Sequence, residues 1–170
     1  IVGGNGSEEP IGSTGEQDIL FGNRGNDIIN GNEGEDTIYA GKDDDLAHGG
    51  KDNDVIYGDR ANDTIIGDRG NDSLFGGVSD INVGDPEGQD LLYGLTGDDF
   101  LNGNENKDTV SGGEGNDTAH GGKDNDVIYG NEDNDLIFGD LGNDTISGGN
   151  GRGLVAKPVD SGEDDDRILG

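Results

Sequence analysis

The sequence predicts an all-β solenoid, in which short strands from many repeated units stack on one another. Three observations lead to this fold class. Aspartate recurs every nine residues from Asp18 to Asp144, with one interval of eighteen. When the chain is cut so that this aspartate is sixth in its unit, the eighth position is aliphatic in every contiguous unit. Most units open with glycine, and the chain has 36 glycines, which argues against helices.

Each unit divides into a turn and a very short strand. Units such as "GGKDNDVIY" and "GNRGNDIIN" begin with glycine and asparagine, which tolerate positive φ and permit tight turns. They end with residues of β character around one aliphatic side chain. One inward side chain per strand does not hold a hairpin together, so the copies must stack to form a common core.

The units define the expected domain organisation. Seventeen contiguous nonapeptides run from residue 4 to 156, an insertion occupies residues 157–160, and a further unit spans residues 161–169. We therefore expect one domain over residues 1–170. Because the chain has no methionine at all, we also expect it to be part of a longer protein.

A second, longer period lies over the first. The string "AHGGKDNDVIYG" at 47–58 returns without change at 119–130, eight units later. The units that lack the sixth-position aspartate have Glu9, Ile81 and Gly153 in its place, and these residues are also eight units apart. The sequence therefore indicates a duplicated module of eight units.

Composition excludes several classes of protein. Only 27% of the residues are hydrophobic, and the net charge of −29 would keep a chain without ligands close to the disordered class. A cation must neutralise this charge if the chain folds. The acidic excess argues against nucleic acid and anionic membranes as partners, and no apolar run is long enough for membrane insertion. The absence of cysteine excludes disulfides and thiolate metal sites.

The pattern Gly-Gly-x-Gly-x-Asp-x-aliphatic-x, nearly complete in "GGEGNDTAH" at 112–120, resembles the RTX (hemolysin-type) calcium-binding nonapeptide repeat. The resemblance implies a right-handed parallel β-roll with two nonapeptides per coil, so that each unit stacks on the unit eighteen residues away. It also implies Ca²⁺ between stacked turns, bound by the sixth-position carboxylates and by backbone carbonyls, which suits a cation that prefers six to eight oxygen ligands. The predicted metal ligands are Asp18, Asp27, Asp36, Asp45, Asp54, Asp63, Asp72, Asp90, Asp99, Asp108, Asp117, Asp126, Asp135 and Asp144.

The stacking rule gives a count of sites. Aspartates of even-numbered units should form one unbroken edge, in which Asp90 follows Asp72, whereas the other edge is interrupted at Glu9, Ile81 and Gly153. Counting neighbours on both edges predicts about eleven well-formed calcium sites. That many divalent ions would cancel most of the negative charge. We therefore expect disorder without calcium and cooperative folding with it.

Aromatic residues occupy the outward ninth position of successive even units. They predict a strip of rings on one face, which either stiffens the sheet or contacts another domain, another chain or a saccharide. The strip comprises Phe21, Tyr39, Tyr57, Phe75 and Tyr93. His48 and His120 also occupy ninth positions and are predicted to be independent surface residues.

The predicted function is that of a calcium-binding structural module of a secreted bacterial protein, located outside the cell. The resemblance implies that the module stays unfolded in the low-calcium cytosol and is similar to substrates of type I secretion. Two alternatives remain: a spacer or adhesive segment of a surface protein, and an accessory tail of a secreted enzyme. No nucleophile and base are paired in any known catalytic motif, so no catalytic residue is predicted and the segment itself is not expected to be an enzyme.

Overall fold

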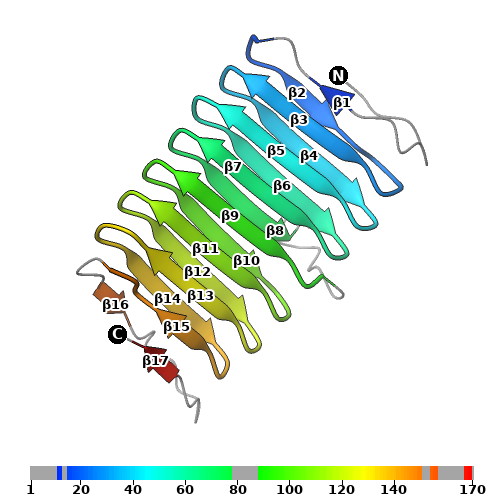
Figure 1. The fold of residues 1–170 in the computed structure, drawn as a ribbon. Coiled ribbons are helices and arrows are strands. Elements are labelled where there is room, and N and C mark those ends of the chain that lie inside the picture. The colour runs from blue at the N-terminus through cyan, green and yellow to red at the C-terminus, as the bar shows by residue number, and fades with distance from the viewer. Residues whose placement is uncertain (1–10, 13–14, 78–87, 151–153, 157–166, 170) are drawn as a thin grey trace.

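The chain folds into two parallel β-sheets that lie face to face (Figure 1), and its described residues form seventeen strands. The computed structural model describes residues 11–12, 15–77, 88–150, 154–156 and 167–169, and this part of the chain contains no helix. The odd sheet has nine strands: β1 (Ile11–Gly12), β3 (Ile28–Glu33), β5 (Leu46–Lys51), β7 (Thr64–Arg69), β9 (Leu91–Thr96), β11 (Thr109–Glu114), β13 (Val127–Asn131), β15 (Thr145–Ser147) and β17 (Arg167–Leu169).

The even sheet has eight strands and runs alongside the odd sheet. Its strands are β2 (Ile19–Phe21), β4 (Thr37–Lys42), β6 (Val55–Arg60), β8 (Ser73–Gly77), β10 (Phe100–Asn104), β12 (Thr118–Lys123), β14 (Leu136–Leu141) and β16 (Leu154–Ala156). The chain crosses from one sheet to the other after every strand, so two nonapeptides complete one coil. The two ends of the chain lie at opposite ends of the stack (Figure 1).

The coils stack in the register that the sequence predicts over most of the chain. In the pair β4 and β6, for example, Ile38 lies opposite Ile56 in parallel register, two units along the chain. The prediction of a parallel roll with two nonapeptides per coil is therefore confirmed.

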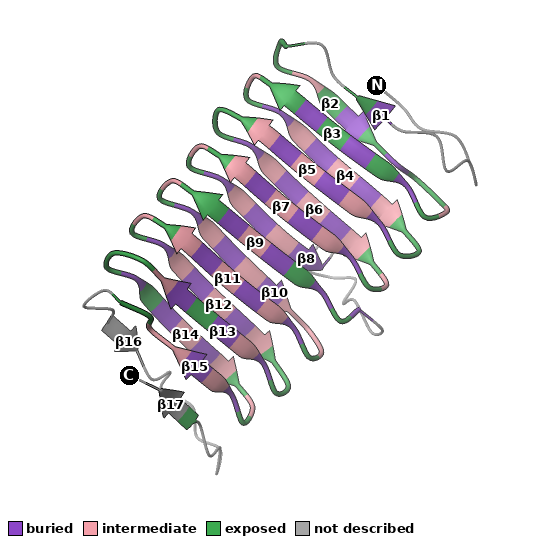
Figure 2. Ribbon diagram, viewed as in Figure 1, coloured by how far each residue is buried: buried purple, intermediate pink, exposed green. Residues whose placement is uncertain are grey.

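The core is a narrow layer of aliphatic side chains between the two sheets (Figure 2). Every described eighth-position side chain is at most 6% exposed, and each large one contributes roughly 1.5–3 kcal/mol through burial. The buried eighth positions are Ile11, Leu20, Ile29, Ile38, Ala47, Ile56, Ile65, Leu74, Leu92, Leu101, Val110, Ala119, Ile128, Ile137 and Ile146. The side chains of Val83 and Val155, predicted for the same column, lie outside the described residues.

The turns depend on left-handed backbone at the second and fourth positions of the nonapeptide. In the unit that begins at Gly112, for example, Gly113 has φ 132° and Gly115 has φ 131°. Where glycine is replaced at these two positions, the residue is mostly asparagine or aspartate, the residues that tolerate this conformation best. Ala61 and Leu95 are the exceptions, with φ of 80° and 79°. The glycines of the repeat are therefore required by the backbone.

The stacking rule fails at one place, the stretch between β8 and β9. There Thr64 pairs with Leu91 and Ser73 pairs with Phe100, so the paired strands are three units apart instead of two. The stacking rule predicts that the ninth unit pairs with the seventh and eleventh units, and this pairing is wrong because β7 pairs directly with β9. Residues 78–87, including Ile81, lie outside the described residues. From β9 onward, the odd-numbered and even-numbered units exchange sheets.

A hydrogen bond explains why the ninth unit is passed over. The N–H group of Asp63 donates to Oδ1 of Asp90 at 2.7 Å, the bond that joins successive aspartates elsewhere in the stack. With an offset of two units, the partner of Asp63 would be Ile81, which has no acceptor. Passing over one unit therefore satisfies a buried N–H group that would otherwise lose its partner.

At the C-terminal end, β17 pairs with β15 at an offset slightly larger than two units, since Thr145 lies opposite Arg167. The predicted insertion at 157–160 and most of the unit at 161–169 lie outside the described residues. That residues 1–170 form one domain remains a prediction.

Candidate metal centre

The predicted ligand aspartates line the two edges of the roll, where the chain turns from one sheet to the other. Thirteen of the fourteen are at most 4% exposed, and Asp18, in the first described coil, is partly buried. Carboxylates are rarely buried so completely unless they are paired or bound to metal. Their burial in two columns is the central feature of this chain.

One carboxylate oxygen of every aspartate from Asp36 onward holds the coils together. The backbone N–H group of one aspartate donates to Oδ1 of the aspartate one coil further on, at 2.7–3.1 Å, in twelve successive pairs. These bonds fix the orientation of the accepting carboxylates and satisfy buried N–H groups. The second oxygen of each carboxylate, Oδ2, takes no part in these bonds.

The second oxygen is buried without a protein donor. Nine of the described aspartates have a buried Oδ2 atom that accepts no hydrogen bond: Asp27, Asp36, Asp45, Asp54, Asp72, Asp99, Asp117, Asp126 and Asp135. A buried carboxylate oxygen left in this state costs several kcal/mol. Since the same atom is left over in coil after coil, the arrangement calls for a repeated positive ligand.

A glycine at the first position of each unit keeps space open beside this oxygen. At Gly31, a methyl group in place of the α-hydrogen would lie 2.5 Å from Oδ2 of Asp36 and would also overlap the carbonyl oxygen of Gly49, one coil further on. A carboxylate oxygen and a carbonyl oxygen thus converge on a space that only glycine leaves free. We call this space the cradle of the aspartate.

Among the described first-position residues, Ala40 is the exception, because it stands where the equivalent units have glycine; Ser13 and Asp85 also replace this glycine, outside the described residues. The methyl group of Ala40 is fully buried, in the unit that carries Asp45. Gly76 supplies the first position for Asp90, across the stretch that the stacking passes over. The cradle is therefore preserved at the point where the pairing offset changes.

The structure corrects the predicted composition of the two edges. Asp72 is followed by Asp99, and Asp63 is followed by Asp90, so the predicted neighbours Asp72 and Asp90 lie on different edges. One edge carries Asp18, Asp36, Asp54, Asp72, Asp99, Asp117 and Asp135. The other carries Asp27, Asp45, Asp63, Asp90, Asp108, Asp126 and Asp144. Among the described coils, neither edge is interrupted.

Burial raises the pKa values of several of these carboxyl groups in the metal-free fold, among them Asp45 and Asp54. The pKa of Asp99 rises to about 7 and that of Asp126 to about 8, chiefly because burial removes water from the charged form. Neighbouring carboxylates raise them further, whereas the hydrogen bond from the preceding aspartate lowers them. Without a cation, the fold therefore favours protonated aspartates.

This rise in pKa predicts that protonation of the buried carboxyl groups at low pH partly replaces metal binding in stabilising the fold. A carboxyl group with a higher pKa in the folded state stabilises the fold below its unfolded pKa of 3.8, and this contribution is lost as pH rises through about 7 to 8. In chelator, we expect a disordered far-UV circular dichroism spectrum at pH 8 and substantial β-structure near pH 4. Equal disorder of monomeric chain at both pH values would contradict this prediction.

The donor set fits calcium. In the described part of the chain, no three His, Cys, Asp or Glu side chains form a metal-binding group, so a bound ion must draw on backbone oxygens as well as on carboxylates. Carboxylate and carbonyl oxygens are the ligands that Ca²⁺ prefers, whereas Zn²⁺ favours nitrogen and sulfur. The cradles supply both kinds of oxygen and no soft ligand.

Comparison with known proteins agrees with this geometry. A sequence model of the RTX calcium-binding nonapeptide repeat matches four times, at residues 13–47, 48–80, 87–119 and 120–155. The chain belongs to the RTX calcium-binding nonapeptide repeat family. The RTX matches stop at residue 80 and resume at residue 87, where the stacking offset changes. No curated protein matches the chain, and the described residues contain no helix able to cross a membrane.

The predicted aromatic strip is only partly correct. Phe21, Tyr39, Tyr57 and Phe75 stack in a column on the even sheet, with ring centroids 4.9–5.2 Å apart. Tyr93 lies on the odd sheet, opposite Ile66, because the offset of three units moves it to the other face. The predicted strip of five rings is therefore correct for its first four residues and wrong for Tyr93.

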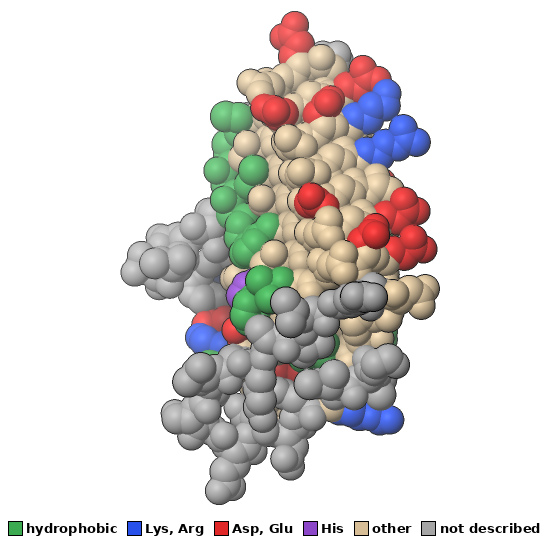
Figure 3. Space-filling model, turned by 90° about the vertical axis from the view of Figure 1, so that its left-hand side faces the viewer, with side chains coloured by type: hydrophobic (Ala, Val, Ile, Leu, Met, Phe, Trp, Pro, Cys, Tyr) green, Lys and Arg blue, Asp and Glu red, His purple; other side chains and the backbone are tan. Residues whose placement is uncertain are grey.

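The column continues beyond Phe75 with residues that the sequence analysis did not assign to it. Phe100 packs against Phe75 at 5.7 Å, His120 packs against Phe100 at 5.7 Å, and Phe138 stacks on His120 at 4.4 Å. Hydrophobic side chains accordingly gather along one side of the roll (Figure 3). Phe100 was missed because it occupies the seventh position of its unit and replaces Asn102 in the column.

Proposed function

We propose that this chain is a calcium-dependent structural module that is disordered in the low-calcium cytosol and folds after secretion. The observation that carries the proposal is the repeated buried Oδ2 atom without a protein donor, set beside a space that glycine keeps open. Filling these cradles with Ca²⁺ would neutralise a chain of net charge −29. Binding free energy thereby becomes folding free energy.

We propose twelve calcium positions, one for each pair of successive aspartates, in place of the eleven counted from the sequence. The increase follows from the corrected edges, since both are continuous through the described coils. Equilibrium dialysis of the folded chain with calcium quantified by atomic emission is expected to give about twelve ions per chain. Substantially fewer than eleven would contradict the assignment.

The cradles can be tested individually by substitution. Gly94→Ala places a methyl group against Oδ2 of Asp99 and the carbonyl oxygen of Gly112, so we expect one ion fewer and a several-fold higher calcium midpoint of folding. Ala40→Gly gives this unit the glycine that the equivalent described units have. We expect it to lower the calcium midpoint of folding, because the cradle of Asp45 would then bind calcium more tightly. Unchanged binding in both variants would mean that calcium does not use the cradles.

Extracellular location and export through type I secretion are part of this proposal. They are supported by the family and by the acidic, cysteine-free composition, since calcium is abundant outside cells. The repeat is a structural unit, and we propose that any catalytic activity of the parent protein resides outside this segment.

We propose that the part of the aromatic column from Phe21 to Phe75 stiffens the even sheet and is not a saccharide platform. Neighbouring rings from Phe21 to Phe75 are nearly parallel, with interplanar angles of 8–12°, so each ring face is covered by the next ring. Only ring edges remain for a partner. Stacked rings contribute about 0.5–1.5 kcal/mol per pair beyond the area they bury.

A further inference from the structure

A polar patch on the outer surface of the roll is built twice from the same residues. The first patch consists of Asn30, Asn32, Glu33, His48, Gly50, Lys51 and Asp68, on β3, β5 and β7 of the odd sheet. The second consists of Asn102, Asn104, Glu105, His120, Gly122, Lys123 and Asp140, on and directly beside β10, β12 and β14 of the even sheet. All seven residues are identical, eight units apart.

The contacts within the two patches are also identical. Nδ1 of His48 lies 3.0 Å from Oδ2 of Asp68, and Nδ1 of His120 lies 2.8 Å from Oδ2 of Asp140. Each histidine ring is thus held by an aspartate one coil further on, with its Nε2 directed away from that carboxylate.

The asparagines and lysines repeat as well. Lys51 pairs with Glu33, and Lys123 pairs with Glu105. In both patches the second asparagine donates its backbone N–H group to Oδ1 of the first, at 2.9 and 3.1 Å. The constellation is therefore preserved in geometry as well as in sequence.

The other outer face of the module is less well preserved at the equivalent positions. At the ninth, second and third positions of the units, seven of nine residues agree between the patch-bearing strands of the two copies. On and directly after β2, β4 and β6 and their counterparts β9, β11 and β13, only two of nine agree, Gly41 with Gly113 and Tyr57 with Tyr129. At the seventh positions the patch-bearing strands differ in all three pairs, whereas the other strands agree in two of three, so preservation of the patch face is confined to the carboxyl halves of its strands.

Backbone requirements and stability account for only part of this preservation. Left-handed backbone explains three residues of each patch, since Gly50, Asn32 and Asp68 have φ of 118°, 71° and 75°, and their counterparts have φ of 115°, 81° and 66°. It does not explain the other four, Asn30, Glu33, His48 and Lys51. Exposed ion pairs such as Lys51 with Glu33 contribute only about 0–1 kcal/mol. The calcium cradles do not use these outward side chains. Ligand binding is a reason for these four residues to persist together.

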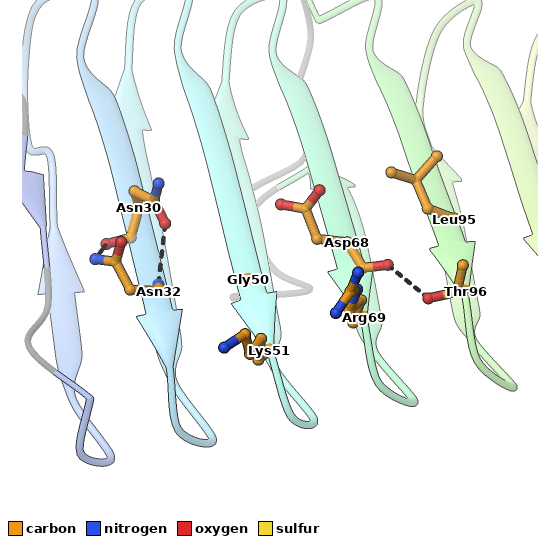
Figure 4. A pocket seen from close by; sticks show the side chains of 8 residues that line it. All are labelled: Asn30, Asn32, Gly50, Lys51, Asp68, Arg69, Leu95 and Thr96. Atoms are coloured by element: carbon orange, nitrogen blue, oxygen red, sulfur yellow. Dashed lines mark hydrogen bonds between the residues drawn. The ribbon is translucent and has the colours of Figure 1, made fainter.

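The first patch opens into a shallow depression of about 430 Å³, within the range of small-ligand sites (Figure 4). Five residues of the patch line it, and Gly50, which has no side chain, leaves its centre open; His48 and Glu33 lie outside the lining. The lining comprises Asn30, Asn32, Gly50, Lys51 and Asp68 of the patch, together with Arg69, Leu95 and Thr96. An apolar residue lies beside the histidine in each patch, since Ile66 is opposite His48 and Phe138 is opposite His120.

The chemistry of the patch favours a neutral, hydroxyl-rich ligand. Amide, imidazole and ammonium groups donate, and carboxylate and amide oxygens accept, all within one shallow surface. The lysine is neutralised by its glutamate, and the chain carries a net charge of −29, so an anion would be repelled. Fixed donors and acceptors beside one apolar side chain match the hydroxyl groups and C–H face of a sugar.

We propose that the two patches are saccharide-binding sites, each taking one residue of a neutral glycan. Because the pairing offset of three units moves the second copy to the even sheet, the sites face opposite sides of the roll. One chain can therefore bridge two glycan strands. The sites exist only in the folded roll, so this inference rests on the calcium-dependent folding proposed above.

The test uses the calcium-loaded chain on a printed array of neutral and acidic glycans, followed by calorimetry with the neutral glycan retained best. We expect two binding sites per chain. The double substitution His48→Ala with Asp68→Asn should leave one site. Adding His120→Ala and Asp140→Asn should weaken binding at least tenfold. The single substitutions Asp68→Asn and Asp140→Asn provide milder variants if the larger sets do not fold.

The matched control is Asp59→Asn with Arg60→Glu, which gives the first copy the residues that the second carries at Asn131 and Glu132. It should retain both sites. Circular dichroism in calcium confirms that each variant folds and separates loss of the patch from failure of the roll. Retention of acidic glycans only, absence of neutral-glycan binding by a folded chain, or undiminished binding by the fourfold variant would overturn the proposal.

Discussion

Chelating calcium is expected to convert the folded chain into a disordered one, with complete and reversible loss of its β-type circular dichroism spectrum. Thirteen buried aspartates on two edges repel one another when no cation is present. A site filled at a hundred times its dissociation constant adds about 2.7 kcal/mol to stability. A few such sites already contribute free energy within the range of roughly 5–15 kcal/mol by which ordinary domains are stable.

The measurement is a far-UV circular dichroism titration of the chelated protein with calcium, with magnesium as the control. Calcium should induce a steep, cooperative transition, because each ion orders two turns and thereby prepares the neighbouring sites. Magnesium should fail at equal concentration, since it demands octahedral geometry and dehydrates reluctantly. A β-type spectrum already present in chelator at pH 8, and unchanged by calcium, would show that the aspartates are not ligands on which the fold depends.

Gly97→Ala is expected to destabilise the roll by more than about 3 kcal/mol, near the upper end of single-substitution effects. Gly97 has φ of 136°, a conformation that side chains rarely adopt, and an added methyl group would overlap the carbonyl oxygen of Gly70 in the preceding coil. The added methyl group is attached directly to the backbone and would meet a backbone oxygen of Gly70, so no side-chain rotation could relieve the overlap. The coils on either side of the passed-over stretch would have to separate.

The comparison is with Gly148→Ala, at a glycine whose added methyl group would meet no atom within 4 Å and whose φ is not positive. Thermal unfolding in saturating calcium should show a melting temperature lowered by many degrees for Gly97→Ala and nearly unchanged for Gly148→Ala. Equal melting temperatures would mean that the tight approach of Gly97 to Gly70 is not maintained in solution.

Local features of the repeat could be predicted from the sequence because they depend on residues within one unit. The buried aliphatic at the eighth position, the aspartate at the sixth and the left-handed turns follow from residue type and a period of nine. The twin patches could also have been found by comparing the two copies at outward positions. The sequence analysis predicted His48 and His120 to be independent surface residues and did not connect them with Asp68 and Asp140, which lie twenty residues further along the chain.

The sequence by itself determined the stacked units, their inward aliphatic column and the aspartates that recur along the edges, since each depends on a periodicity that survives stacking, and the resemblance to the repeat family supplied the parallel roll. Only the tertiary structure decided which aspartates are neighbours across the irregular unit. The missing aspartate in the ninth unit allows Asp72 to meet either Asp90 or Asp99, and the choice depends on pairing between coils. The stack selects Asp99 for Asp72 and Asp90 for Asp63 because each buried N–H group then meets a carboxylate. The same pairing places Tyr93 on the odd sheet. It also places the second patch on the even sheet, on the side of the roll opposite the first patch.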